Sequence, residues 1–487
     1  GTTEEQLDIA LREAIDAQVL RATADGYRFR HALLAEAVYT ELLPGERVRA
    51  HRRFAEALED GVPGLDENTA AGQLAHHAHA AHDQPLALVT AWRAADRAEC
   101  TAAYPEQLAL YERVLELWER VPEAERLIDN PLGEVLYRAS EASLAAGEQR
   151  RAIDYASHGL RELGVLGHHD PGGPRPENAV LVARLRHVRG SALKNLGRDG
   201  ALEELADAAV VLPAGHPLNA IVGATLATTL MMRGHLEKGH RAASRALDLA
   251  RRVGDRHSEA DTLITLGTIM TGKEHEVQFG RLAEGIQIAR EHEHAQVEIR
   301  GLINLAAHLG ERCRFEEAAD VYTRGMRRCG ELGLTHSQGG FFTYGLASVL
   351  SEQGNLDQAE EILTRTLGNP LVEARAQSLV MQISLLRWDL GRFSAAREKF
   401  GRLLPERDSA PREHVPIHSL SMLEAAYNED LDRALEIALS LLDRIGAEHG
   451  GALGSLFFVA LIASMLRDEP GWQQAADDLV VGLAEAA

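Results

Sequence analysis

The sequence predicts an all-α protein built from helical hairpins that repeat along the chain. Aromatic residues make up only 5% of the 487 residues, whereas large β-sheet proteins use more aromatic and β-branched side chains. Alanine, leucine, glutamate and arginine dominate instead, and these residues lose little side-chain freedom on entering a helix. The length also exceeds what one hydrophobic core holds, about 250–300 residues. A repeating architecture is therefore favoured over a single globule.

A helix, a turn and a second helix recur with a period of about 37–42 residues. From residue 197 onward the turns lie 37, 38, 42, 40, 37 and 38 residues apart. A turn of this kind is expected at a glycine, which accepts the positive φ that ends a helix. Small residues stand five positions after most turns and seven positions before them, where the two helices would pack closely. The turns assigned in this way are Gly147, Gly197, Gly234, Gly272, Arg314, Gly354, Gly391 and Glu429.

This pattern resembles the tetratricopeptide repeat, although the units here are longer than its usual ~34 residues. The resemblance implies a right-handed superhelix whose first helices line a concave groove. Methionine, aromatic and isolated polar side chains at the groove positions suit an adaptable recognition surface. The alternative is that these residues form core between the repeats. The residues at the family's groove offsets are Asn304, His308, Arg312, Phe341, Tyr344, Met381 and Trp388.

The first sixty residues do not follow the repeat. Helical periodicity over residues 3–18 is followed by two strand-like runs that flank residues 24–26, which is a hairpin signal. A helix followed by a β-hairpin is similar to the closing half of a winged-helix module. We therefore expect four segments: a partial winged-helix domain (1–45), a first helical array (46–163), a Gly/Pro-rich loop (164–178) and tetratricopeptide-like repeats (179–487).

The stretch FRHALLAEAVYTELLPGERVRAHRRFAEALE, from Phe29 to Glu59, carries a more specific resemblance. It is similar to the junction between the winged helix and the helical arm in large ATP-binding transcription regulators of the LuxR type. These are signal-transduction NTPases related to the maltose-regulon activator and common in actinomycetes. The similarity is strongest over residues 27–60 and looser as far as residue 117.

The resemblance implies a sensor arm that binds an inducer, either a small molecule or a protein. Through its own NTPase domain the intact parent would then oligomerise and bind DNA. No GxxxxGK[ST] motif occurs, and the last residues do not resemble a LuxR-type recognition module. ATP or ADP is therefore expected only in an NTPase domain outside this chain, and no cofactor in the chain itself. The alternatives are a free-standing tetratricopeptide scaffold for a protein partner, or a regulatory arm of a nucleotide cyclase or kinase.

His31 lies in the run Arg30-His31-Ala32-Leu33-Leu34. This run is similar to the MHD-type motif of signalling NTPases, whose histidine touches the β-phosphate of the bound nucleotide. The resemblance implies that His31 senses the nucleotide in the full-length parent, although alanine replaces the aspartate of the motif. The alternative is a histidine that packs or caps a helix.

Four histidines crowd into the run AHHAHAAHD, namely His76, His77, His79 and His82. Of these, His76, His79 and His82 step by three along a predicted helix, so a divalent metal is conceivable there. Imidazoles alone rarely make a natural structural site, and we expect no metal. The sequence contains no nucleophile elbow, HExxH motif or Gly-rich phosphate loop. We therefore expect that the chain is not an enzyme.

The formal net charge of −22 opposes direct binding to nucleic acid or to anionic membranes. Three cysteines without a CxxC pair indicate a reducing compartment. No apolar run approaches the ~20 residues of a membrane span. We expect a cytoplasmic protein and leave open whether it forms a homo-oligomer.

Overall fold

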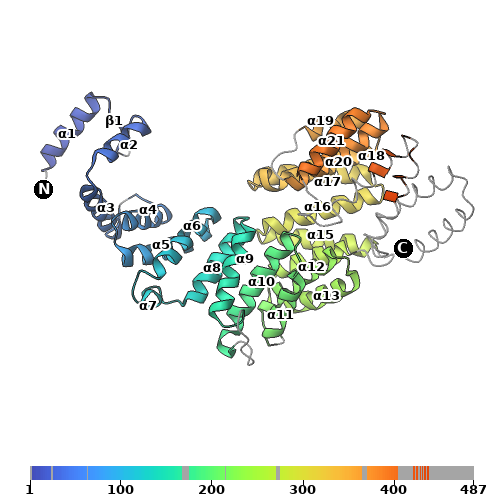
Figure 1. Cartoon of the computed structure of the whole chain (residues 1–487), viewed down its shortest axis with the longest axis horizontal. Coiled ribbons are helices and arrows are strands. Elements are labelled where there is room, and N and C mark those ends of the chain that lie inside the picture. Colours follow the sequence, from blue (N-terminus) through green and yellow to red (C-terminus); the bar gives the residue numbers. More distant parts are fainter. Residues whose placement is uncertain are drawn as a thin grey trace, which may run out of the picture. The chain divides into compact units, whose positions relative to one another are not determined.

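A computed structural model describes residues 3–23, 26–62, 64–101, 103–166, 175–213, 215–269, 275–364 and 370–403, with short pieces between 420 and 437. Within these ranges the chain is helical apart from one two-stranded sheet (Figure 1). The predicted all-α, tetratricopeptide-like fold is confirmed. Contacts divide the chain into two compact units, Gly1–Leu181 and Val182–Ala487.

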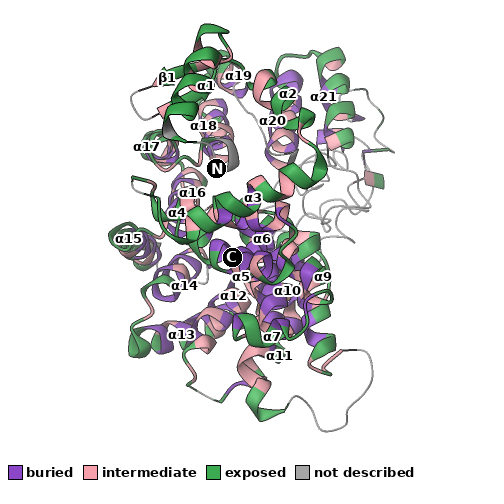
Figure 2. Cartoon of the chain, turned by 90° about the vertical axis from the view of Figure 1, so that its left-hand side faces the viewer, coloured by how far each residue is buried: buried purple, intermediate pink, exposed green. Residues whose placement is uncertain are grey.

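The first unit opens with the helix and hairpin that the sequence predicts: α1 (Glu4–Asp16), β1 (Leu20–Thr23) and β2 (Gly26–Phe29), followed by α2 (Ala32–Glu41). The strands pair antiparallel, with Leu20 opposite Phe29. Thr3 caps α1, because its hydroxyl accepts from the Gln6 amide while the Gln6 side chain accepts from the Thr3 amide. No described residue of these four elements is buried, as their green and pink colouring in Figure 2 shows.

The rest of this unit is a compact helical array. Tyr111 lies fully buried at its centre, with the Trp92 ring edge-on at 5.5 Å. Successive helices pack against each other, α4 on α5, α5 on α6 and α8 on α9. The helices are α3 (Pro44–Glu59), α4 (Glu67–Ala80), α5 (Gln84–Cys100), α6 (Tyr104–Trp118), α7 (Ala124–Ile128), α8 (Leu132–Ala145) and α9 (Gln149–Glu162), and a 3₁₀ turn (Pro176–Asn178) follows.

The second unit consists of consecutive hairpins, and the first helices of neighbouring hairpins contact each other from α12 through α14, α16 and α18 to α20. A short π-helical segment, η2 (Thr335–Gly339), precedes α18. The helices are α10 (Ala179–Asn195), α11 (Ala201–Val211), α12 (Leu218–Met232), α13 (Leu236–Val253), α14 (Arg256–Thr268), α15 (His275–Glu291), α16 (Ala295–Glu311), α17 (Phe315–Glu331), α18 (Gly340–Glu352), α19 (Leu356–Leu363), α20 (Pro370–Leu386) and α21 (Leu390–Leu403).

The two helices of a hairpin approach each other at paired small residues. Ala347 of α18 and Ala359 of α19 are fully buried in one core cluster. A Cβ atom on Gly239 would lie 3.3 Å from the carbonyl oxygen of Ala227, which leaves no room for a larger side chain. The small residues seven positions before and five positions after a turn therefore lie where the two helices of a hairpin pack against each other.

Four predicted turns have the expected left-handed glycine, whereas two lie elsewhere. Gly147, Gly197, Gly234 and Gly354 have φ between 66° and 82°. In the α16–α17 hairpin the left-handed residue is Cys313 (φ 58°). The predicted turn residue, Arg314, is instead the N-cap of α17. In the α20–α21 hairpin it is Trp388 (φ 60°), and Gly391 lies inside α21. The turns assigned to Gly272 and Glu429 fall outside the described residues.

The four segments expected from the sequence stay a prediction. Contacts separate the two units at residues 181 and 182, near the start of α10. Most of the Gly/Pro-rich segment 164–178 falls outside the described residues. No helix in the described ranges combines the length and apolar character that crossing a bilayer requires.

Replacing Ala347 or Ala359 with leucine should overpack the α18–α19 contact and lower the free energy of unfolding by ~1–3 kcal/mol. Ala395→Leu is the matched control, because Ala395 is exposed on α21. Thermal unfolding followed by circular dichroism measures the effect. Equal melting temperatures for all three variants and the wild type would show that these alanines are not packing contacts.

Replacing Cys313 with glycine should stabilise the second unit by about 0.5–1 kcal/mol, because an exposed L-residue at positive φ carries a steric cost that glycine lacks. Cys100 is also exposed, but it ends α5 in a helical conformation, so Cys100→Gly should bring no gain. Denaturant unfolding of both variants tests the assigned turn. A loss of stability in Cys313→Gly would contradict it.

Candidate functional site

The second unit contains a hollow with a volume of about 640 Å³, here called the first-helix hollow. Its lining comes from α10, α12, α14, α16, η2, α18 and α20, so nearly every hairpin of the unit contributes its first helix. The stacking of first helices creates this surface, as the tetratricopeptide resemblance implies. Its lining is mixed, with apolar, hydroxyl, amide, imidazole and charged side chains.

Polar contacts tie the first helices together beside and within the hollow. Arg300 on α16 donates from Nη2 to both the carboxylate Oδ1 and the main-chain oxygen of Asp261 on α14, each at 2.7 Å. Next to this pair, the Asn304 amide donates to the Thr268 hydroxyl at 2.9 Å. The Asp261 carboxylate is thus engaged in holding two neighbouring hairpins in register.

Two titratable groups on α10 are strongly affected by the hollow. Burial lowers the pKa of Lys194 and the Arg300 charge lowers it further, while Asp261 acts in the opposite direction. Burial and then the charges of Lys194 and His257 lower the pKa of His187 to about 4. His187 is therefore neutral at pH 7.

The hydrogen bonds around His187 define its tautomer. Its Nε2 lies 3.0 Å from the hydroxyl oxygen of Thr225. That hydroxyl gives its single proton to the carbonyl oxygen of Ile221, so the neutral imidazole donates from Nε2 to Thr225.

Ser258 and Lys194 line the hollow without a bonding partner of their own. The Ser258 hydroxyl oxygen is fully buried on α14 and makes no hydrogen bond with any described residue. Lys194 has no hydrogen bond or ion pair to a residue in the described ranges. Buried polar groups are nearly always bonded, so the Ser258 hydroxyl retains a hydrogen-bonding capacity that a ligand or water in the hollow can use.

Among the seven residues predicted to line a groove, Phe341 alone belongs to the lining of this hollow. Asn304 lies beside it and bonds across to α14. His308 is buried on α16, with Nδ1 3.1 Å from the Glu311 carboxylate. Arg312 is the C-cap of α16, and Tyr344 packs against the core cluster of α18 and α19.

The last two predicted residues, Met381 and Trp388, do not occupy groove positions, because the turn lies at Trp388 instead of Gly391. Met381 then stands seven residues before the turn and is fully buried against Phe393, which leaves it no surface for a ligand in this conformation. Trp388 lies in the turn itself, with 68% of its surface exposed. Ligand binding by the remaining predicted residues stays a prediction.

His31 lies at the N-cap of α2 and is exposed. Its side chain makes no capping hydrogen bond, and α2, the helix that follows it, contains no buried residue. Neither packing nor capping accounts for this histidine. Nucleotide sensing in the parent stays a prediction.

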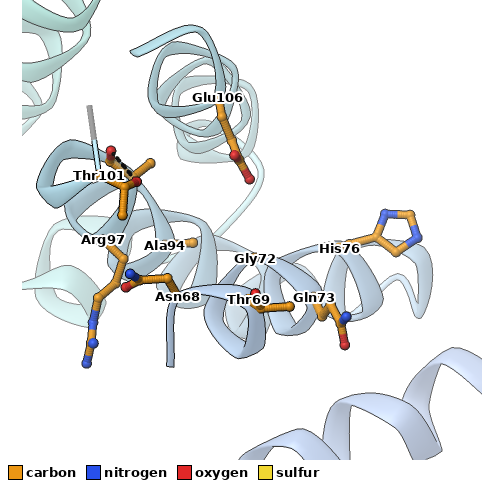
Figure 3. A pocket seen from close by; sticks show the side chains of 10 residues that line it. Asn68, Thr69, Gly72, Gln73, His76, Ala94, Arg97, Thr101 and Glu106 are labelled. Carbon is orange, nitrogen blue, oxygen red and sulfur yellow. Dashed lines mark hydrogen bonds between the residues drawn. The ribbon is translucent and has the colours of Figure 1, made fainter. Parts of the chain in front are cut away.

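The first unit contains a smaller hollow of about 410 Å³ between α4, α5 and α6. Figure 3 shows Glu106 reaching from α6 toward Gly72 on α4, whereas His76 stands at the far end and points away from the other residues. The Arg97 side chain is paired with Glu67. With a single carboxylate and one paired arginine on α5, this surface offers a ligand fewer convergent groups than the first-helix hollow.

A histidine cluster joins α2, α3 and α4 in the first unit. The Tyr39 hydroxyl lies 3.0 Å from His51 Nε2, and His51 Nδ1 lies 2.7 Å from His77 Nδ1. Burial first, and then the neighbouring imidazoles, lower the pKa of both His51 and His77. The evenly spaced trio that the sequence analysis considered for a metal was His76, His79 and His82, and only His76 of these belongs to the cluster. His82 has a left-handed backbone conformation in the turn between α4 and α5. His51 was missed because it is distant in sequence.

The ligand atoms of His51, His76 and His77 lie within 4.8 Å of one another, a grouping that suits a transition metal by residue type. The 2.7 Å between the two Nδ1 atoms is, however, a hydrogen-bond distance. Two nitrogens bound to one tetrahedral zinc would lie about 3.3 Å apart, given Zn–N bonds of ~2.0–2.1 Å. The geometry fits a hydrogen-bonded relay better than a metal centre.

Comparisons with known proteins agree only at the level of repeat architecture. No protein-family model and no curated protein sequence matches the chain. Similar solved structures include a Rap protein complexed with competence and sporulation factor (13% identity, 74% of this chain, 99% of the other, TM-score 0.42). Others are a STAND protein with a tetratricopeptide repeat sensor from Pyrococcus horikoshii (13%, 82% and 58%, 0.43) and a human IFIT1 dimer with m7Gppp-AAAA (15%, 90% and 94%, 0.44).

Stability of the histidine cluster should decrease as the pH falls. Because the folded pKa of His51 and His77 is lowered, the unfolded chain binds more protons just below pH 6.5, and the free energy of unfolding falls as the pH drops through this range. His51→Phe should cost ~1–2 kcal/mol at pH 7.5 through its lost hydrogen bonds, and its stability should fall less steeply with acid. Denaturant unfolding between pH 7.5 and 5.5 measures both.

The control for this measurement is His158→Phe, since His158 is an exposed imidazole on α9 outside the cluster. Its pH dependence should parallel that of the wild type. If His51→Phe and His158→Phe had the same slope, the cluster would not be the source of the acid sensitivity.

Proposed function

We propose that the chain is a non-catalytic sensor and interaction arm of a cytoplasmic transcription regulator of the large ATP-binding LuxR type. The observation that carries the proposal is the first-helix hollow. It is formed by side chains from six successive first helices, and its volume of about 640 Å³ lies within the ~300–1,000 Å³ of small-ligand sites. An inducer bound there touches several hairpins at once.

The N-terminal segment supports the idea that another domain packs against it. Between α1 and the start of α3 no described residue is buried, and large apolar side chains such as Leu33 (76% exposed) and Leu43 (67% exposed) face outward. Exposed apolar patches of this kind mark interaction surfaces. In the proposed parent the occupant is its own NTPase domain, and His31 at the N-cap of α2 is available to the nucleotide.

The proposed mechanism is a population shift and includes no chemical step in this chain. Inducer bound to the arm favours the open, oligomerising ATP state of the parent over the closed ADP state, by as much as its affinities for the two states differ. Asp261 and His187 suit the coupling of neighbouring hairpins, because both are engaged in hydrogen bonds between first helices.

Two alternatives place the same arm in another context. A free-standing scaffold would bind a protein partner with no NTPase attached, and a cyclase or kinase arm would carry a different effector domain. The reading frame on both sides of the segment separates these cases. A P-loop NTPase before residue 1 and a helix-turn-helix after residue 487 is the expected result, and a cyclase or kinase domain would replace the proposal.

Filling the hollow should abolish the inducer response of the intact protein. Thr225 lines the hollow on α12, and Thr225→Trp should lower inducer-dependent oligomerisation at least tenfold. Thr323→Trp places the same side chain on the exposed face of α17 and should respond as the wild type does. Light scattering with ATP and inducer measures the response. A full response in Thr225→Trp would contradict a sensor role for the hollow.

A further inference from the structure

The first-helix hollow is basic, although the chain as a whole has a net charge of −22. Three permanently or ordinarily charged cations line it, Lys194, Arg300 and Arg375, against the single carboxylate of Asp261. That carboxylate accepts a hydrogen bond from Arg300, which also donates to the main-chain oxygen of Asp261. The hollow thus carries an excess of positive charge, whereas the chain as a whole carries an excess of negative charge.

Lys194 is the cation that this arrangement leaves without a partner. Its pKa is lowered mainly by burial, so the charged form is held in a site that disfavours it. The Asp261 carboxylate favours the charged form but makes no direct ion pair with Lys194. A partly buried ammonium without an ion pair is costly, and a bound anion lowers this cost. The chain contains only four lysines, Lys194, Lys238, Lys273 and Lys399, and arginine supplies the remaining basic residues.

A second observation, independent of charge, points to the same place. The buried Ser258 hydroxyl on α14 lines the hollow and bonds to no described residue. A hydroxyl can donate its proton to an anionic oxygen, and such charge-assisted hydrogen bonds are about twice as strong as neutral ones. The Lys194 ammonium and the Ser258 hydroxyl line the same hollow. Together they offer a positive charge and a hydrogen-bond donor, which are the groups that bind a carboxylate or a phosphate.

We propose that the first-helix hollow binds a small organic anion, whose carboxylate or phosphate lies against Lys194 and Ser258 and whose apolar part lies against Phe341. The proposal rests on the function proposed above and specifies the chemical class of the inducer. The volume of about 640 Å³ suits a small molecule. An acidic peptide would need a surface that extends beyond this hollow.

The four lysines make a direct test practical. In the full chain with ¹³C-methylated lysines, the Lys194→Met variant identifies the Lys194 signal. Inorganic phosphate should shift that signal in a saturable way and raise the pKa of Lys194, because a bound anion stabilises the charged amine. The other three lysines should follow ionic strength alone. Equal shifts of the Lys194 signal in phosphate and in chloride at matched ionic strength would overturn the proposal.

Affinity measurements test the organic part and the kind of anion. By calorimetry, 1-naphthoate or 1-naphthyl phosphate should bind at least tenfold more tightly than the neutral 1-naphthamide. Lys194→Met should remove that advantage and Ser258→Ala should reduce it. Lys238→Met, on the exposed face of α13, should leave it unchanged. The tighter of the two anions distinguishes carboxylate from phosphate, and binding restricted to acidic peptides would overturn the assignment to a small molecule.

Failure of this proposal is distinguishable from failure of the sensor role. If Lys194→Met left the affinity for both anions unchanged while Thr225→Trp still abolished the parent's response, the hollow would remain a sensor site for a neutral inducer. If anions bound through Lys194 but the parent responded normally with Thr225→Trp, the anion site would stand and the sensor role would fall.

Discussion

The structure of the second unit depends on the close approach of two helices at paired small side chains. Ala347 and Ala359 are buried in one core cluster of the α18–α19 hairpin, and Gly239 lies close to the backbone of α12 in an earlier hairpin. Because the helices of each hairpin lie so close, the first helices of neighbouring hairpins can stack directly on one another. The stacked first helices carry the Arg300–Asp261 contact and enclose the hollow beside it. Enlarging the small residues therefore disturbs the site as well as the core.

The sequence predicted the repeat and its period, yet it misplaced two turns. Glycine was the signal, and it is reliable where glycine occupies the left-handed position, as Gly354 does. Cys313 and Trp388 adopt the same conformation without being glycine, and nothing in a single sequence marks such residues. The turn of the α20–α21 hairpin was predicted at Gly391, three residues after its actual position at Trp388. Counting back from the wrong residue assigned the wrong face of α20 to the groove, and Met381 was expected there although it lies in the core.

The candidate site was harder to predict than the fold. Offsets from a repeat family assign residues one hairpin at a time, and of the residues that they gave, Phe341 is part of the lining of the hollow. Lys194, His187 and Ser258 are not among the residues at these offsets. Burial and hydrogen bonding distinguish them, and only the packed structure shows these properties. A signal for Lys194 did exist, since the chain contains only four lysines.

Helical arrays transmit a ligand's effect differently from globular domains. Each hairpin normally contacts only its neighbours, so the stability of the array is close to a sum of hairpin terms and nearest-neighbour interfaces. Lys194 on α10 and Ser258 on α14 are separated by the whole α12–α13 hairpin, yet both line one hollow. A ligand that contacts both adds a coupling between hairpins that are not neighbours. Under the proposed sensor function, such a ligand biases how the first helices stack along the array, and this bias is read at the end of the array without any covalent step.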